Sequence, residues 1–101
     1  MARINTRRRG ARNERRAKII LEDDGYYVCK ASASLGAWDL VCFNHHHLRL
    51  VQVKTNRCRL SEKKALIRFQ APEFAIKELW IFKDRVADPL IEVLAYDPEI
   101  V

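Results

Sequence analysis

The chain has 101 residues, 49% of them hydrophobic, which suits one globular domain with a single core and argues against intrinsic disorder. No apolar stretch is long enough to span a membrane, and an arginine run follows Met1, so we expect neither a membrane helix nor a secretory signal. Three cysteines without a CxxC pair fit neither a disulfide scaffold nor a zinc ribbon, and they favour a reduced, cytoplasmic compartment.

The positive charge is concentrated near the N-terminus. The net charge is +6, and residues 1–18 alone carry +7, with eight basic side chains and one acidic side chain, Glu14. Such a block is typical of a segment that binds a polyanion, because a guanidinium group donates paired hydrogen bonds to phosphate. The alternative is a solvated arm that only aids solubility. We expect residues 1–9 to form a basic arm and residues 10–101 a single domain.

The first predicted element is a helix over residues 11–24. Its pattern places Glu14 on the same face as Leu21, and Gly25 follows where a helix C-cap is expected. A carboxylate on an apolar, inward-facing stripe breaks the local pattern and marks a candidate functional residue. The simpler alternative is an ion pair with Lys18, one turn further along.

The other predicted elements follow in order. They are a strand over 26–29, a hairpin of strands 37–43 and 48–54, a helix over 61–69, and strands over 78–82 and 90–96. We expect Ser61 to cap the second helix. Both hairpin strands are apolar on both faces, which is typical of a sheet covered by helices on each side. The sequence therefore predicts a small α/β domain, one mixed β-sheet flanked by helices.

The hairpin brings polar side chains together. A four-residue turn at 44–47 sets the register so that Asp39 lies opposite Gln52, and Lys54 falls on the same face because side chains alternate. A carboxylate, an amide and an ammonium group so close to the sheet are costly to bury unless they pair or hold an ion. An ion pair between Asp39 and Lys54 is one alternative. The histidines at 45–47 predict a solvated turn rather than a metal site.

These groups suit metal-dependent hydrolysis of a phosphodiester. Asp39 would supply a hard oxygen ligand, and the Gln52 side chain and the Val53 carbonyl would supply two more. Lys54 could orient the attacking water or balance the charge that develops at phosphorus. The neighbouring arginines would hold the nucleic-acid backbone.

Four segments together resemble one enzyme family. They are residues 25–28, the serine-containing loop 30–34, residues 38–41 and residues 51–55. With Glu14 on the first helix, this set resembles the PD-(D/E)xK nucleases and, among them, the archaeal-type Holliday-junction resolvases, including versions carried by phages. The resemblance covers residues 8–85 and implies the restriction-endonuclease-like α/β fold.

The resemblance implies a role for each matching residue. Asp39 matches the principal metal-binding aspartate, and Lys54 matches the catalytic lysine. Glu14 matches a helix carboxylate that contributes to the metal site directly or through water. Ser34, or alternatively Ser32, matches a loop serine close to the scissile phosphate.

Two positions depart from the family's pattern. Gln52 stands where resolvases carry a glutamate; its amide oxygen can ligate magnesium, but with one negative charge fewer, so we expect weaker metal binding. Mrr-like restriction nucleases carry such a QxK motif, so the change alone does not imply an inactive enzyme. Trp38 stands where the motif's name has a proline.

The resemblance implies a Mg²⁺-dependent homodimer, with Mn²⁺ as a substitute, that cuts four-way or otherwise branched DNA in recombination and repair. We expect no small-molecule cofactor, a location in a prokaryotic cytoplasm or a phage-infected host, and a contribution of residues 90–96 to the dimer interface. The expected DNA contacts are Arg3, Arg7, Arg8, Arg9, Arg12, Arg15, Lys30 and Arg57. The alternatives are an Mrr-like or other PD-(D/E)xK nuclease or nickase acting on duplex DNA, a catalytically weak DNA-binding module with this fold, and an RNA-binding protein.

Overall fold

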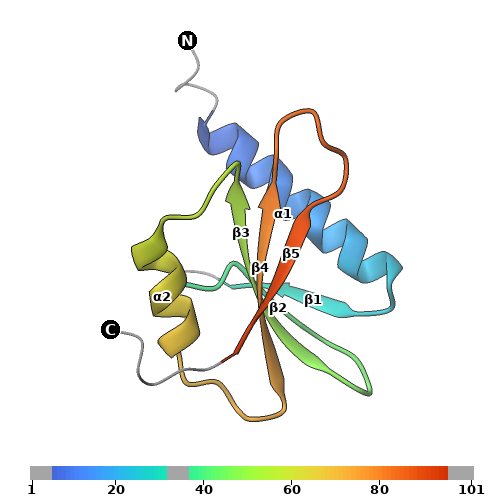
Figure 1. The fold of residues 1–101 in the computed structure, drawn as a ribbon. Helices are drawn as coiled ribbons and strands as arrows, with labels where there is room; N and C mark the ends of the chain where they lie inside the picture. The colour runs from blue at the N-terminus through green and yellow to red at the C-terminus, as the bar shows by residue number, and fades with distance from the viewer. Residues whose placement is uncertain (1–5, 32–36, 96–101) are drawn as a thin grey trace.

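The computed structural model describes residues 6–31 and 37–95, which form two helices and a five-stranded sheet. In chain order the elements are α1 (Thr6–Asp23), β1 (Tyr27–Lys30), β2 (Leu40–Phe43), β3 (Leu48–Thr55), α2 (Leu60–Arg68), β4 (Ala75–Phe82) and β5 (Leu90–Leu94) (Figure 1). This order of helix, three strands, helix and two strands confirms the prediction from the sequence.

The sheet is mixed, as predicted, with the strand order β1-β2-β3-β4-β5. Neighbouring strands are antiparallel except for β3 and β4, which are parallel. A parallel pair needs a long crossover between its strands, and α2 provides it. The sheet therefore consists of an antiparallel part before α2 and a hairpin after it.

The β2–β3 hairpin has the predicted register, in which Phe43 pairs with Leu48. Asn44 closes the turn, since its side-chain oxygen accepts hydrogen bonds from the backbone N–H groups of His46 and His47, each at 2.8 Å. The histidine side chains at 45–47 are exposed, as expected for a solvated turn.

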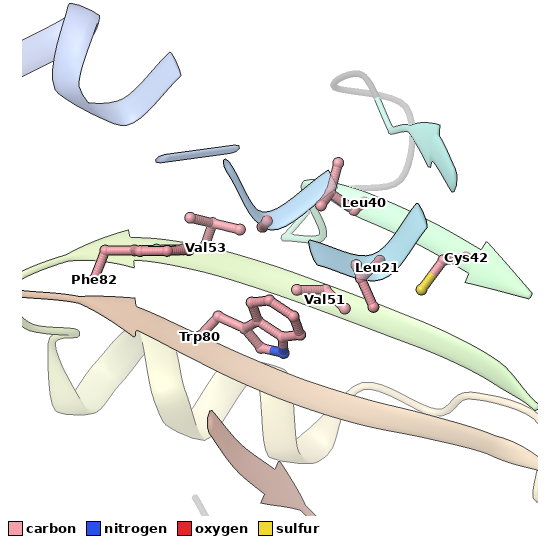
Figure 2. Packing of buried hydrophobic residues seen from close by; sticks show 8 residues of the cluster. Leu21, Leu40, Cys42, Val51, Val53, Trp80 and Phe82 are labelled. Carbon is pink, nitrogen blue, oxygen red and sulfur yellow. The ribbon is translucent and has the colours of Figure 1, made fainter. Parts of the chain in front are cut away.

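Helix α1 covers one face of the sheet. Its Ala17 and Leu21 side chains are buried against the strands. The sheet residues of this core cluster are Leu40, Cys42, Val51, Val53, Trp80 and Phe82 (Figure 2). Burying an aliphatic or aromatic side chain contributes about 1.5–3 kcal/mol to folding, so this cluster fixes α1 over β2, β3 and β4.

Helix α2 covers the opposite face, where the second cluster consists of Trp38, Leu50, Leu66, Leu79 and Leu94. The end of the helix is held by Lys77 of β4, whose side chain is buried. Its Nζ donates to the carbonyl oxygens of Leu66 at 2.9 Å, Ile67 at 2.6 Å and Phe69 at 2.8 Å. The last carbonyl groups of a helix lack hydrogen-bond donors within the helix, and the Lys77 ammonium group provides these donors.

Helix α1 begins at Thr6, earlier than the predicted residue 11. Arg7, Arg8 and Arg9, which we expected in the basic arm, are therefore helical. Arginine is a good helix former, and Gly10 lowers helix stability without ending the helix. Among the described residues, no helix combines the length and the apolar character needed to cross a membrane.

Other boundaries also differ from the prediction, among them the start of β2, which is Leu40 rather than residue 37. The N-cap of α2 is Arg59 in an extended conformation without a side-chain hydrogen bond, so the expectation that Ser61 caps this helix is wrong. Strand β4 begins at Ala75 rather than at residue 78, because its two charged residues are buried and paired. One is Lys77, and the other is Glu78, which accepts hydrogen bonds from Arg49 at 2.8 and 2.6 Å.

Candidate functional site

Asp39 lies immediately before β2, between the ends of β1 and β3. Its N–H donates to the carbonyl of Val51 at 3.0 Å, and its own carbonyl accepts from the N–H of Ala31 at 2.8 Å. The carboxylate Oδ2 accepts from the backbone N–H of Val53 at 2.9 Å. Burial raises the pKa of Asp39 above its ordinary value, against the opposing effects of the Val53 N–H and two nearby lysines. Three backbone contacts thus hold a partly desolvated carboxylate in place.

Gln52 faces Asp39 across the hairpin, as the register predicts. With the amide oriented to satisfy its hydrogen bonds, Nε2 donates to Oδ2 of Asp39 at 3.1 Å and also to the carbonyl of Ala37. A half turn of the amide brings Oε1 to the same place, which is the orientation that a cation beside Asp39 would require. Gln52 can therefore either donate to Asp39 or join it as an oxygen ligand.

Glu14 reaches the same group from α1. Its side chain is 27% exposed, and Oε1 lies 3.9 Å from Nζ of Lys30. Burial and then the negative charge of Asp39 raise the pKa of Glu14, so the two carboxylates interact although they belong to different elements. Lys18, the alternative partner, instead lies 4.0 Å from Glu22.

Lys54 extends from β3 toward α2. Its Nζ donates to Oε2 of Glu62 at 2.8 Å, so the lysine binds Glu62 rather than Asp39. Its charge nevertheless opposes the rise in the pKa of Asp39. This hydrogen bond is also the main reason why the pKa of Glu62 lies below its ordinary value. Glu62 was not among the residues predicted from the sequence; its position in the first turn of the second helix was the available signal.

The structure thus brings Glu14, Gln52 and Lys54 together around Asp39. Two carboxylates whose pKa values are raised form a donor set whose repulsion a divalent cation would relieve, so the chemistry fits Mg²⁺. In residues 6–31 and 37–95 no three His, Cys, Asp or Glu side chains gather closely enough to hold a metal. A cation here would therefore depend on the Gln52 oxygen, backbone carbonyls and water as well.

The predicted DNA contacts gather mainly on α1. The arginines that line a hollow on this helix are Arg8, Arg9, Arg12 and Arg15. Arg9 also forms an ion pair with Asp84 at 2.6 Å, and Lys30 lies beside Glu14. Arg7 and Arg57 are exposed.

Three of the predicted residues lie outside the described residues. Ser34 and its alternative Ser32 fall in the segment 32–36, between β1 and Asp39. Arg3 falls in the segment 1–5, before α1.

The helix α1, the antiparallel β1–β2–β3 segment, the α2 crossover and the parallel β4 together form the restriction-endonuclease-like α/β fold, which confirms the predicted fold class. The chain is similar to Hjc, a Holliday junction resolvase from the archaeal hyperthermophile Archaeoglobus fulgidus. The TM-score is 0.63 at 17% sequence identity, and the match covers 83% of this chain and 73% of that one. No protein-family model and no curated protein matches the sequence.

Proposed function

We propose that the protein is a metal-dependent endonuclease that cuts branched DNA, with four-way junctions as its preferred substrate. The observation that carries this proposal is the convergence of Glu14, Gln52 and Lys54 on Asp39. The fold shared with a Holliday junction resolvase supports the choice of substrate.

Each residue has a part in this proposal. Asp39, Glu14 and the Gln52 oxygen would hold Mg²⁺, or Mn²⁺ in its place. The cation supplies Lewis-acid activation of a water molecule and neutralises charge on the phosphate. Lys54 donates hydrogen bonds to the negative charge that develops at phosphorus, and Glu62 holds its ammonium group close to the sheet.

The arginine-rich half of α1 would deliver the DNA to this group. Glu14 lies on the same helix as Arg8, Arg12 and Arg15, so DNA held by these arginines would lie against the element that carries one of the two carboxylates. Contacts to phosphates position a duplex without reading its sequence, which suits recognition of a branched shape. Ser34 would contribute a hydroxyl near the scissile phosphate.

A homodimer belongs to the proposal, because resolution of a four-way junction needs two cuts. The edge strand β5 supports a protein partner, since its Leu90, Ile91 and Val93 side chains are 57%, 47% and 64% exposed. Light scattering with size-exclusion chromatography should give twice the mass of the chain. Val93→Glu should lower the measured mass to that of a single chain, because it places a charge in the proposed interface.

One observation favours a second candidate, a DNA-binding module with weak or no catalysis. The Gln52 amide satisfies Asp39 with a hydrogen bond, which an added cation would have to replace. A nuclease or nickase that acts on plain duplex DNA is the third candidate. A comparison of cutting on a linear duplex and on a junction distinguishes it from the first.

The decisive experiment compares the wild type with Asp39→Asn on an immobile four-way junction in Mg²⁺. We expect paired, symmetric cuts from the wild type and a loss of about 10³-fold in rate from the variant, because a ligand charge is removed. Junction affinity should not change, since the asparagine oxygen can still accept from the Val53 N–H. Asp88→Asn, the same change at an exposed residue, is the matched control.

The outcomes separate the candidates. Unchanged cutting by Asp39→Asn would place the chemistry elsewhere. Binding without cutting in either Mg²⁺ or Mn²⁺ would establish the binding module. Equal rates of cutting on a linear duplex and on the junction would exclude a preference for junctions but would still support a nuclease.

A further inference from the structure

Asn13 is a buried polar residue on α1, directly before Glu14. Its side chain is 3% exposed, although asparagine is mostly a surface residue. Its Nδ2 donates to Oγ1 of Thr55 at 2.9 Å, and its Oδ1 accepts from Nη1 of Arg16 at 3.1 Å. Both ends of the amide are therefore used, which compensates the cost of burying it.

Thr55 is the last residue of β3 and directly follows Lys54. Because side chains alternate along a strand, Thr55 shares the α1 face with Val53, whereas Lys54 points to the α2 face. The hydrogen bond from Asn13 to Thr55 thus lies one residue from Glu14 on the helix and one residue from Lys54 on the strand.

Asn13 belongs to a polar stripe on α1 that Arg9 and Arg16 complete, since positions 9, 13 and 16 share one face of a helix. Arg9 forms an ion pair with Asp84 at 2.6 Å, and Arg16 donates to the carbonyl of Ala87 at 2.6 Å. These two contacts are exposed and reach the connection between β4 and β5. The bond from Asn13 is the one that joins the stripe to β3.

A hydrogen bond fixes a distance that apolar packing leaves loose. The C-terminal half of α1 rests on Ala17 and Leu21, and such contacts have no preferred direction. Ala17 and Leu21 hold this half of α1 on the sheet, but they lie about one and two turns beyond Glu14, so they restrain a shift along the helix axis less at Glu14 itself. The buried bond between Asn13 and Thr55 opposes that shift at the turn of α1 that carries Glu14.

We propose that Asn13 and Thr55 are positioning residues, whose hydrogen bond holds Glu14 at the distance from Asp39 and Lys54 that cleavage requires. The inference rests on the proposed function of that group. Neither side chain belongs to the group itself, so each acts through the element that carries it.

The test compares Thr55→Val with Thr55→Ser in the full-length chain. Valine keeps the shape and the branching at Cβ but removes the hydroxyl, and serine keeps the hydroxyl. The core variant Leu50→Ala, on the opposite face of the sheet, is the control for lost stability. The measurements are urea unfolding, Mn²⁺ binding without DNA by electron paramagnetic resonance, and kcat and KM on a four-way junction.

We expect Thr55→Val to weaken Mn²⁺ binding about 10-fold and to lower kcat about 10- to 100-fold, with KM for the junction unchanged. Thr55→Ser should behave like the wild type. Leu50→Ala should lose stability while keeping both Mn²⁺ binding and kcat. Should Thr55→Val fail to fold, the double variant Asn13→Ala/Thr55→Val leaves no buried amide without a partner and should show the same loss of kcat.

Two results would overturn the inference. If the valine variant keeps the Mn²⁺ affinity and kcat of the wild type, the bond does not position Glu14, and the nuclease proposal stands. If Leu50→Ala loses as much Mn²⁺ affinity and kcat as the valine variant, lost stability alone is the cause. A wild type that neither binds Mn²⁺ nor cuts the junction instead refutes the proposed function, and the positioning role with it.

Discussion

Gln52 decides how strongly the group around Asp39 can attract a cation. Its amide carries no charge and donates to Oδ2 of Asp39, where a glutamate would add a further carboxylate. The residue therefore adds no further charge beside Asp39, whose pKa burial already raises, or near Glu14, whose pKa is raised by burial and then by the charge of Asp39. In the proposed nuclease, Gln52 thus favours the folded state without metal, and it also weakens metal binding because it supplies no charge.

Gln52→Glu should reverse this balance. Without metal we expect the free energy of unfolding to fall by on the order of 1 kcal/mol, because another negative charge joins Asp39. With Mn²⁺ we expect binding about 10-fold tighter, since affinity rises with the number of charged oxygen ligands. Urea unfolding in EDTA and calorimetric titration with Mn²⁺ measure the two effects.

Gln70→Glu, which adds the same charge at an exposed residue after α2, is the control. If Gln52→Glu and this control gave the same Mn²⁺ affinity, position 52 would not be a ligand.

Among the elements, α2 depends most on a neighbour. It has no side-chain cap at its N-terminus, and its C-terminal carbonyls rely on the Lys77 ammonium group from β4. Burial lowers the pKa of Lys77, which shows that the contact is made at some cost in hydration. The helix that carries Glu62 is thus held in place by the strand that it covers.

Lys77→Met should destabilise the fold by about 2 kcal/mol, because buried carbonyl groups lose a charged donor. The expected readout is a lower urea midpoint with an unchanged slope. Lys83→Met, the same change at an exposed residue, should have almost no effect. Equal midpoints for the two variants would mean that water replaces the ammonium group without loss.

Local patterns in the sequence predicted the hairpin well. The polar turn and the two-residue alternation were enough to place Asp39 opposite Gln52 and to put Lys54 on the same face, because both rules act over a few residues. The start of β4 could not be predicted in this way. Glu78 looks solvated in the sequence, and its burial follows from its hydrogen bonds with Arg49, which is far away along the chain, and with the buried Trp80.

The same limit applied to Glu62 and Asn13. Each is an ordinary polar residue of a helix in the sequence. Their partners, Lys54 for Glu62 and Thr55 for Asn13, lie on β3 and are set by the tertiary fold. The predicted roles of Ser34 and Arg3 remain predictions.

On the scale of the whole molecule, many of the arginines lie on α1, and this helix lies on one side of the sheet (Figure 1). Because each neutralised phosphate releases counterions, the proposed DNA binding should depend steeply on salt. Arg7 and Arg8, which form no ion pair within the described part of the chain, should matter more for that dependence than Arg9 or Arg16, whose side chains already bind Asp84 and Ala87.

Replacement of Arg7 and Arg8 by glutamine should reduce the slope of log affinity against log salt by about 0.9 for each lost phosphate contact. Fluorescence anisotropy with a labelled junction at several salt concentrations gives the slope. The control replaces Arg59 and Arg68, which flank and end α2, and keeps the same net charge. An equal change of slope in both variants would show that α1 has no special contact with DNA.

The group around Asp39 draws on all three layers of the molecule: Glu14 comes from one helix, Asp39 and Lys54 from the sheet, and Glu62 from the other helix. Asn13 and Thr55, which join the first two layers, are separated by 42 positions. During synthesis, the arginine-rich helix thus leaves the ribosome well before the strand that completes its partner. If the proposed function holds, a chain that has not yet made β3 could bind nucleic acid through α1 but would lack the assembled group around Asp39.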